Sequence, residues 1–404
     1  MNKKKIFNDP VYGFVEIPQG IIFDLIEHPW FQRLRRIKQL SLTHYVYPGA
    51  LHTRFHHALG ALHLMCQAIE VLRGKDVEIT EEEATAVCIA ILLHDIGHGP
   101  FSHTLEHTLL EITHEEISLL FMEAFNRQFD GALDLAIRIF KNDYPKPFLS
   151  QLISGQLDMD RMDYLNRDSF FTGVYEGVIG YDRIIKMLSV HKGELVVEEK
   201  GIYSIEKFLI ARRLMYWQVY LHKTVLSAEQ MLIRTLRRAR QLVKEGENLP
   251  ASESLMFFLK NKIRREDFAT SPDELLRHFS RLDDYDIVSA MKEWQYGKDM
   301  ILSFLSSGII NRKLFRLKFS DEAFKKTYVE KKKVQILAKT FLMPDEIEYV
   351  FYEGTETNSA YSTVKDEIKI LFKNGKTLPM SSISQHGIQS GSYTKHYLCY
   401  PKNF

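Results

Sequence analysis

The stretch His94-Asp95-Ile96-Gly97-His98-Gly99-Pro100-Phe101-Ser102-His103 decides the fold of this 404-residue chain. It directly follows the apolar segment 87–93, and this order predicts a buried helix that ends in metal-binding side chains. On a regular helix the neighbouring side chains of His94 and Asp95 would diverge by about 100°. The two glycines and the proline let the backbone unwind, so that both side chains can face one ion. The stretch therefore predicts a metal site at the bottom of a pocket.

Two further residues would complete such a site. His57 stands at the start of one predicted helix, and Asp160 stands at the start of another. Three helices that meet would place these two residues with His94 and Asp95 around one metal, with positions left open for water or substrate. Histidine and carboxylate ligands suit one divalent ion of manganese, iron, magnesium, zinc or nickel. A single histidine is more often a hydrogen-bonded polar residue than a ligand, but this combination favours the metal site.

Composition and charge narrow the class of protein. Hydrophobic residues make up 45% of the chain and charged residues 26%, which is typical of a soluble globular protein. The net charge of +1 does not indicate binding to nucleic acid. No apolar run approaches the roughly 20 residues of a membrane span, and the N-terminal lysines precede no apolar stretch of a secretory signal. Cys66, Cys88 and Cys399 are expected to be free thiols, and the protein is expected in the cytoplasm.

Apolar periodicity predicts mostly helices over residues 20–300. One of them covers residues 31–40, and another carries an apolar stripe over residues 59–72. Threonine and glutamate have the spacing of a capping box at 80–83 and again at 113–116, which predicts the starts of two more helices. A long helix is predicted over residues 205–243, because no proline or glycine interrupts this segment.

Two segments predict β-hairpins. In the first, residues 194–198 and 202–205 are extended patterns separated by Lys200-Gly201. In the second, residues 368–372 precede Asn374-Gly375, a dipeptide that favours the type I′ turn. With a helix expected near residues 321–340, the last part of the chain is predicted to be a mixed α+β unit.

The order of His57, His94-Asp95 and Asp160 resembles that of the HD superfamily of metal-dependent phosphohydrolases. Within the superfamily, the chain is similar to the deoxynucleoside triphosphate triphosphohydrolase branch, the relatives of the sterile-alpha-motif and HD-domain dNTPase. The resemblance is strong over residues 5–240 and thinner after them. The matching segments are residues 8–10, 31–40, 47–50, 52–57, 94–103 and 158–164.

The resemblance implies a mostly α fold, with an HD-domain helical core and a smaller C-terminal α+β unit. We expect an HD-type catalytic domain over residues 1–240, whose metal region covers residues 50–170. A helical extension would follow over residues 241–310, and the α+β unit would cover residues 311–404.

Several residues near the expected ligands are candidates for acid–base chemistry. A metal-bound water becomes a nucleophile near neutral pH, and the leaving alkoxide then needs a proton. His98, His103 and His114 can supply one, and Glu106 is close enough in sequence to orient a histidine. The resemblance points to His103 as the residue at the scissile bond, to Glu106 and His114 as its support, and to His98 as a phosphate contact. The alternative for Glu106 is a solvated helix face.

A triphosphate needs several cations, and Arg54, Arg161, Arg212 and Lys223 have the right chemistry. Residues 212, 216, 220 and 223 have the spacing of one helix face, and residues 161, 164 and 168 form a similar stripe. The alternative is an amphipathic helix whose tyrosines cover the core. The resemblance favours substrate contacts. It implies that the sugar of the substrate is bound by Gln39, Leu40 and Asp168. It also implies that Tyr220 packs against the 2′ side of the sugar, and that Tyr164 and Tyr216 contact the substrate.

The resemblance also implies activation by a bound nucleotide and a homo-oligomer, either a dimer or a tetramer. Four residues fall where relatives bind activating nucleotides: Lys5, Asn8, Glu27 and Arg35. The basic runs Lys331-Lys332-Lys333 and Arg237-Arg238 are instead expected to be solvated faces.

The leading hypothesis is a metal-dependent dNTP triphosphohydrolase that converts a dNTP and water to a deoxynucleoside and triphosphate. A second hypothesis keeps the site but changes the substrate, to give a nucleotidase or phosphodiesterase. A third is a nucleotide-sensing or nucleic-acid-binding module with little turnover, which would bind single-stranded nucleic acid with a steep salt dependence.

Overall fold

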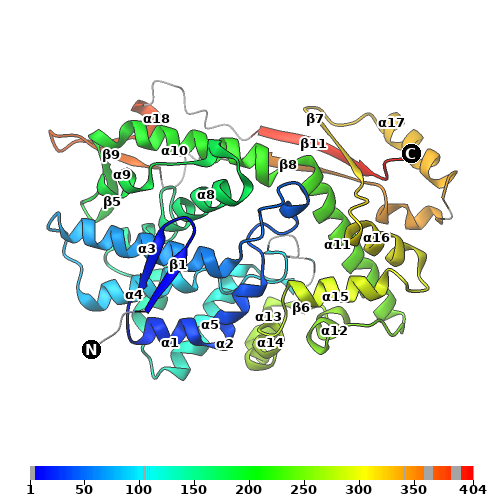
Figure 1. Cartoon of the computed structure of the whole chain (residues 1–404), viewed down its shortest axis with the longest axis horizontal. Coiled ribbons are helices and arrows are strands. Elements are labelled where there is room, and N and C mark those ends of the chain that lie inside the picture. Colours follow the sequence, from blue (N-terminus) through cyan, green and yellow to red (C-terminus); the bar gives the residue numbers. More distant parts are fainter. Residues whose placement is uncertain are drawn as a thin grey trace.

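The computed structural model describes residues 5–102, 106, 108, 110–340, 342–358, 367–383 and 393–403, and these are mostly helical (Figure 1). Three helices form the centre: α3 (Arg54–Arg73), α4 (Glu81–Leu93) and α8 (Met159–Thr172). Helix α3 packs against both of the others. The last eight residues of α4 are all apolar and all buried, which explains why this helix lies inside the protein.

The other helices surround this centre and extend it toward the C-terminal end. They are α1 (Ile21–Glu27), α2 (Pro29–Gln32), α5 (His114–Gln128), α6 (Asp134–Phe140), α7 (Pro147–Gln151), α9 (Tyr181–Lys186), α10 (Ile202–Met215), α11 (Lys223–Lys244), α12 (Glu253–Lys260), α13 (Arg265–Thr270), α14 (Pro272–Phe279), α15 (Asp284–Trp294), α16 (Met300–Ile310), α17 (Lys326–Leu337) and α18 (Met380–Ile383). No helix among the described residues is both long and apolar enough to cross a membrane.

The strands form four small sheets. An N-terminal hairpin pairs β1 (Lys5–Asp9) with β2 (Gly13–Ile17), and β3 (Leu110–Glu111) pairs with β6 (Ile263–Arg264). A three-stranded sheet of order β7-β11-β8 lies at the opposite end of the molecule from α3 and α4 in Figure 1. Its strands are β7 (Arg316–Ser320), β8 (Tyr352–Asn358) and β11 (Tyr393–Tyr400). The predicted fold class, mostly α with a smaller α+β unit, is confirmed.

The fourth sheet joins the C-terminal part of the chain to the helical core. Strands β4 (Leu188–His191) and β5 (Glu194–Glu198) form a hairpin, and β9 (Lys369–Leu371) pairs in parallel with β5. Strand β10 (Thr377–Pro379) completes the order β10-β9-β5-β4. Thus a segment assigned to the C-terminal unit adds strands to a sheet of the first 240 residues, and the domain boundaries stay predictions.

Local sequence rules gave several correct elements. Glu83 N donates to Thr80 Oγ1, and Thr80 N donates to Glu83 Oε2 at 2.9 Å, which closes the predicted capping box of α4. The capping box at 113–116 opens α5 in the same way. The turn that contains Gly375 joins β9 to β10 as expected, but it is not the type I′ turn, because Gly375 has a positive φ of 77° and Asn374 does not. The three cysteines are free thiols.

The first predicted hairpin is wrong in its second strand. Residues 202–205 begin helix α10, and the partner of β5 is β4 on its N-terminal side. The hairpin turn is Lys192-Gly193, whose φ angles of 53° and 81° are both left-handed. Such a pair of positive φ angles matches the twist of a tight hairpin, so this turn outcompetes Lys200-Gly201.

Two predicted helices are interrupted. The segment 205–243 is divided into α10, a π-helical turn over Tyr216–Tyr220 and α11. Residues 31–40 contain the end of α2, a 3₁₀ turn over Arg33–Arg36, a single β-bridge at Lys38 and a turn over residues 39–40. Tertiary hydrogen bonds explain the end of this segment, because Gln39 N donates to His52 O at 3.0 Å and Arg54 N donates to Ile37 O at 2.9 Å.

Candidate metal centre and active site

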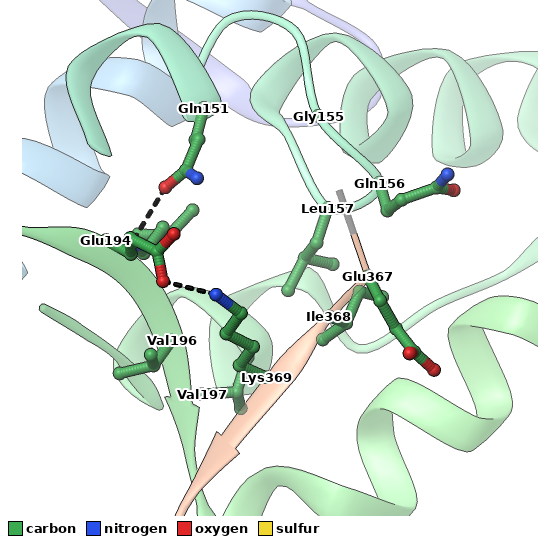
Figure 2. Close-up of a pocket in the computed structure, with 11 residues that line it drawn as sticks. Gln151, Gly155, Gln156, Leu157, Glu194, Val196, Val197, Glu367, Ile368 and Lys369 are labelled. Carbon is green, nitrogen blue, oxygen red and sulfur yellow. Dashed lines mark hydrogen bonds and ion pairs between the residues drawn. The ribbon is translucent and has the colours of Figure 1, made fainter. Parts of the chain in front are cut away.

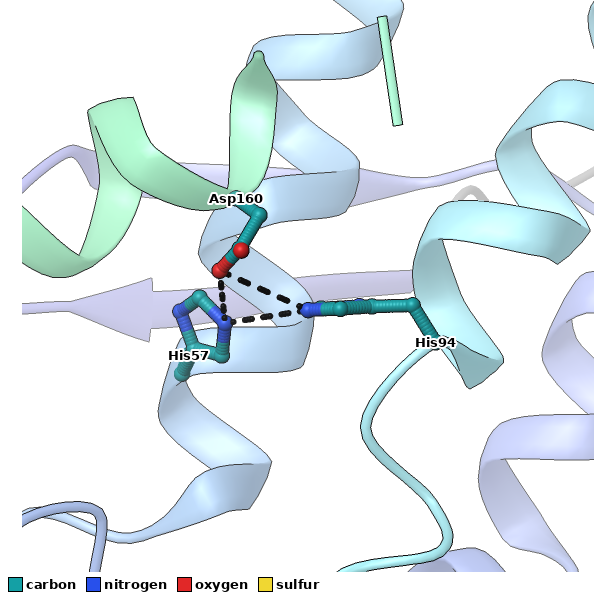
Figure 3. Close-up of side chains that lie close together, drawn as sticks. All are labelled: His57, His94 and Asp160. Atoms are coloured by element: carbon teal, nitrogen blue, oxygen red, sulfur yellow. Dashed lines mark hydrogen bonds and ion pairs between the residues drawn. The ribbon is translucent and has the colours of Figure 1, made fainter. Parts of the chain in front are cut away.

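Helices α3, α4 and α8 bring three predicted ligands together (Figure 3). His57 Nε2 lies 3.1 Å from Asp160 Oδ1, and His94 Nε2 lies 3.5 Å from the same oxygen. The two Nε2 atoms are 3.3 Å apart. Within the described residues, His57, His94 and Asp160 thus form a group that can hold a metal ion.

The hydrogen bonds of the two imidazoles fit a metal. His94 Nδ1 donates to the carbonyl oxygen of Ile91 at 2.6 Å, and His57 Nδ1 lies 2.7 Å from Asp163 Oδ2. A neutral imidazole that donates through Nδ1 keeps a lone pair on Nε2, and Nε2 is the atom of each ring that faces Asp160. The donor set therefore suits a divalent first-row metal.

Asp95 borders this group. Its Oδ2 is 3.5 Å from His57 Nε2, and its Oδ1 is 3.4 Å from His94 Nε2. It also forms an ion pair with Arg54, whose Nε donates to Ser102 Oγ at 2.9 Å. The predicted fourth ligand is therefore adjacent to the other three, and a cation already accompanies it.

Opposing effects set the pKa values of these groups. Burial alone would lower the pKa of His57, but hydrogen bonds to Asp160 and Asp163 outweigh it and raise the pKa to about 10. Burial alone would raise the pKa of the Asp160 carboxyl, but His57 and His94 hold it below its usual value. The same contacts therefore favour the ionised form of the Asp160 carboxyl, which is the form that can bind a metal.

The stretch 94–102 does not turn in the way predicted from its glycines. Helix α4 ends at Leu93, and the left-handed residues are Phe101 and Ser102, with φ of 54° and 53°. Gly97 serves close packing, because a Cβ there would meet His114 O at 2.2 Å and Ser118 N at 2.4 Å. This glycine lets α5 approach the end of α4.

Two of the predicted acid–base residues, His98 and His114, lie beside Asp95. The rings of His98 and His114 stack with centroids 3.9 Å apart, and these two residues form a second His/Asp group with Asp95. His114 Nδ1 is 3.1 Å from Glu106 Oε1, which also accepts from His114 N at 3.0 Å. Burial holds the pKa of His98 well below its usual value. His103 lies outside the described residues.

A cavity of about 530 Å³ opens from this site. Predicted residues that line it are Gln39, Leu40, Arg54, Asp95, His98, His114, Asp160, Tyr164, Asp168, Tyr216 and Tyr220. Another part of its wall is one face of α11, which consists of Leu226, Glu229, Gln230 and Ile233. Glu356 of β8 also lines the cavity. The cavity therefore runs from the metal-binding group to residues far along the chain.

Asp168 joins two walls of the cavity. Its Oδ2 accepts from Tyr220 Oη at 2.7 Å, and its Oδ1 lies 2.8 Å from His52 Nε2. His52 is buried, and its ring stacks on Phe171 with centroids 4.5 Å apart. Sequence reasoning gave His52 no role, because nothing in its neighbourhood separates it from the other histidines of the same segment.

The other predicted cations are placed differently. The shared helix face expected from spacing does not exist, because the chain leaves the helix after Tyr220 and Lys223 begins a new one, where it is exposed. Arg212 is buried and its Nη1 donates to Gln156 Oε1 at 3.2 Å. Arg161 forms an ion pair with Asp158. Roles of these cations in phosphate binding stay predictions.

The predicted activator residues do not line the cavity. Lys5 Nζ is 3.0 Å from Glu27 Oε1, so two of them form an exposed ion pair. The Arg35 guanidinium lies 3.5 Å from the ring centre of Phe55, and Asn8 is exposed on β1. Nucleotide binding at these residues stays a prediction.

A second cavity, of about 170 Å³, lies between residues 151–157, β5 and residues 367–369 (Figure 2). An ion pair between Glu194 and Lys369 crosses it. None of the predicted site residues lines it, but Gln156 does, and this side chain also contacts Arg212. The loop that leads into α8 therefore lines this cavity and also contacts the buried Arg212.

Comparisons with known proteins agree with this geometry. The HD domain family model matches residues 54–168, and the HD associated region model matches residues 179–255. The chain is 32% identical to the uncharacterised protein YwfO of Bacillus subtilis, over all of this chain and 93% of that one. It is 31% identical to the deoxynucleoside triphosphate triphosphohydrolase SAMHD1 homolog of Dictyostelium discoideum, over 67% of this chain and 56% of that one.

A solved structure gives a closer match. The crystal structure of a phosphohydrolase from Bacteroides thetaiotaomicron superposes with a TM-score of 0.95 at 50% sequence identity. The match covers 98% of this chain and 100% of that one. The C-terminal strands and the helical core are therefore shared with a phosphohydrolase along its whole length.

Proposed function

Because the chain belongs to the HD superfamily of metal-dependent phosphohydrolases, in the branch of the deoxynucleoside triphosphate triphosphohydrolases, we propose that it hydrolyses a dNTP to a deoxynucleoside and triphosphate. One observation carries the proposal. The cavity is lined by Asp95 and Asp160 and also by the hydrogen-bonded pair of Tyr220 and Asp168. Side chains that can bind a metal and side chains that can bind a sugar therefore line the same cavity. A phosphate chain and a sugar can then be bound together.

In this proposal His57, His94, Asp95 and Asp160 hold the metal. A divalent ion there lowers the pKa of a bound water and polarises a phosphoryl oxygen. Asp163 and the carbonyl of Ile91 fix the two imidazole rings, so that the ligand atoms are oriented before the ion binds. Members of the family bind divalent metals. The geometry of the site and the availability of each metal in the cell determine whether manganese, iron, magnesium, zinc or nickel binds here.

The remaining residues hold and protonate the substrate. Arg54 and His98 border the cavity beside Asp95 and are proposed to contact phosphate oxygens. Water attacks the α-phosphorus and releases a proton to solvent, while the bond from phosphorus to O5′ breaks and its electron pair stays on O5′. His103 is proposed to protonate O5′, with the Glu106–His114 pair as its support.

Product analysis with labelled water tests this proposal. We expect the purified protein, with Mn²⁺ or Mg²⁺ and each dNTP alone and in pairs, to release deoxynucleoside and triphosphate. In H₂¹⁸O the label should enter triphosphate and not the deoxynucleoside, because the bond to O5′ is the one that breaks. Monophosphate or orthophosphate as the first product would indicate another phosphohydrolase. Metal-loaded protein that hydrolyses no dNTP would contradict the proposal.

Tyr220 is proposed to exclude ribonucleotides. Its ring borders the cavity where its hydroxyl contacts Asp168, and we place the 2′ side of the sugar against it. Tyr220→Ala should open space for a 2′-hydroxyl, so that the preference for dATP over ATP in kcat/KM falls by about 10- to 100-fold. Tyr203→Ala, at an exposed tyrosine outside the cavity, is the matched control and should keep the preference. An unchanged preference in the Tyr220 variant would place the sugar elsewhere.

A further inference from the structure

We propose that the N-terminal hairpin β1–β2 supports the metal site from behind, with Asp9 acting as a positioning residue for His57 through Arg167 and Asp163. The inference rests on the proposed metal site. It concerns a residue that lines no part of the cavity and that belongs to neither of the segments matched by the two family models.

The first contact of this route is between His57 and Asp163. His57 Nδ1 lies 2.7 Å from Asp163 Oδ2, and both side chains are fully buried. The ring can rotate about its bond to Cβ unless this partner holds it. A carboxylate on the far nitrogen of a ligand histidine fixes both the proton position and the ring angle, so Asp163 determines where Nε2 points.

Arg167 holds Asp163 in turn. Its Nη2 donates to Asp163 Oδ1 at 2.9 Å, and its Nε donates to Asp163 Oδ2 at 3.0 Å. Its Nη1 donates to Asp9 Oδ2 at 2.7 Å. The guanidinium is completely buried, so it is placed by these two carboxylates and not by solvent.

The hairpin fixes the position of Asp9. The Oδ1 atom of Asp9 accepts from Val11 N at 2.8 Å and from Tyr12 N at 3.0 Å, which are the backbone amides of the turn between β1 and β2. The strands on both sides are paired from Lys5 to Ile17. One carboxylate oxygen thus belongs to the turn and the other to Arg167.

Gly60 gives independent support for this route. It lies on α3 three residues after His57, and a Cβ there would meet Asp163 Oδ1 at 2.0 Å and Arg167 Nη2 at 2.2 Å. The ion pair is therefore pressed against the backbone of the helix that carries His57. This close approach leaves the pair little freedom to shift without moving the imidazole.

The test is metal affinity of Asp9→Asn, a change that keeps the shape of the side chain and removes its charge. We expect affinity of the apoprotein for Mn²⁺, measured by calorimetric titration, to fall by about tenfold, the low end of the effect of partners behind a metal ligand. In Co²⁺-substituted protein, the visible absorption bands should shift, because the ligand geometry changes. Asp24→Asn, the same change at an exposed aspartate of α1, should have neither effect.

A double-variant cycle separates positioning from general destabilisation. If Asp9 acts through Asp163, the loss of affinity in the double variant Asp9→Asn, Asp163→Asn should equal that of Asp163→Asn alone. Additive losses, or an Asp9 variant with wild-type Mn²⁺ affinity and an unshifted Co²⁺ spectrum, would overturn the inference. If Asp9→Asn does not fold, Asp9→Glu keeps the charge, moves the carboxylate and should show the same two effects. Wild-type protein that binds no Mn²⁺, Co²⁺ or other divalent ion would overturn the proposed function instead.

Discussion

His94→Ala is expected to abolish phosphohydrolase activity and to release the metal. His94 Nε2 faces both His57 and Asp160, and no other described imidazole occupies its place at the end of α4. Losing the ion would remove at least about 4 kcal/mol of stabilisation of the charge that develops at phosphorus, which corresponds to about 10³-fold in rate. The measurements are metal content by elemental analysis and turnover of a dNTP under saturating Mn²⁺.

A control variant distinguishes the loss of a metal ligand from the loss of a histidine that has no role in the site. His191→Ala changes a half-buried histidine of β4 that borders neither cavity, and this variant should keep both metal and turnover. The opposite pattern is decisive. A His94 variant that retains wild-type turnover would mean that the reaction takes place away from the group formed by His57, His94 and Asp160.

Arg167→Met is expected to have the largest effect on stability. The arginine lies between the carboxylates of Asp9 and Asp163, and methionine would remove the cation that pairs with both of these buried groups. Removing one partner from a buried ion pair costs about 3–5 kcal/mol, which is a large part of the 5–15 kcal/mol that stabilises a typical domain. The measurement is the urea concentration at which the helical circular dichroism signal is half lost.

The same substitution at the surface gives the comparison. Arg127 pairs with Asp273 at 3.3 Å, but both side chains are mostly exposed, so solvent replaces the lost contact in Arg127→Met. We expect this variant to unfold at the wild-type urea concentration. Equal midpoints for the two variants would show that the buried pair contributes no more than a surface pair.

Residues close in sequence were the most predictable. The capping box of Thr80 and Glu83 depends only on a spacing of three residues, so its bonds could be foreseen together with the start of α4. The grouping of His57, His94 and Asp160 was also foreseeable, because each stands near a helix end and their order resembles that of a known superfamily.

Features that depend on tertiary contacts were not predictable. Nothing near Asp9 in the sequence indicates that its partner is Arg167, which lies 158 residues away. Gly97 was assigned to a backbone turn, although its small size matters because α5 packs against it. The end of α10 also escaped prediction, because Tyr216–Tyr220 contains neither proline nor glycine and only the π-helical hydrogen bonding marks the change.

The π-helical turn over Tyr216–Tyr220 connects α10 to α11. The shape of the cavity therefore depends on the number of residues in this turn as well as on their identity. Each helical residue rotates the chain by about 100°, so loss of a single residue between α10 and α11 would turn the face of Leu226, Gln230 and Ile233 away from the cavity. A substitution in this segment would change one side chain of the wall, whereas a change of length would reposition the whole face of α11.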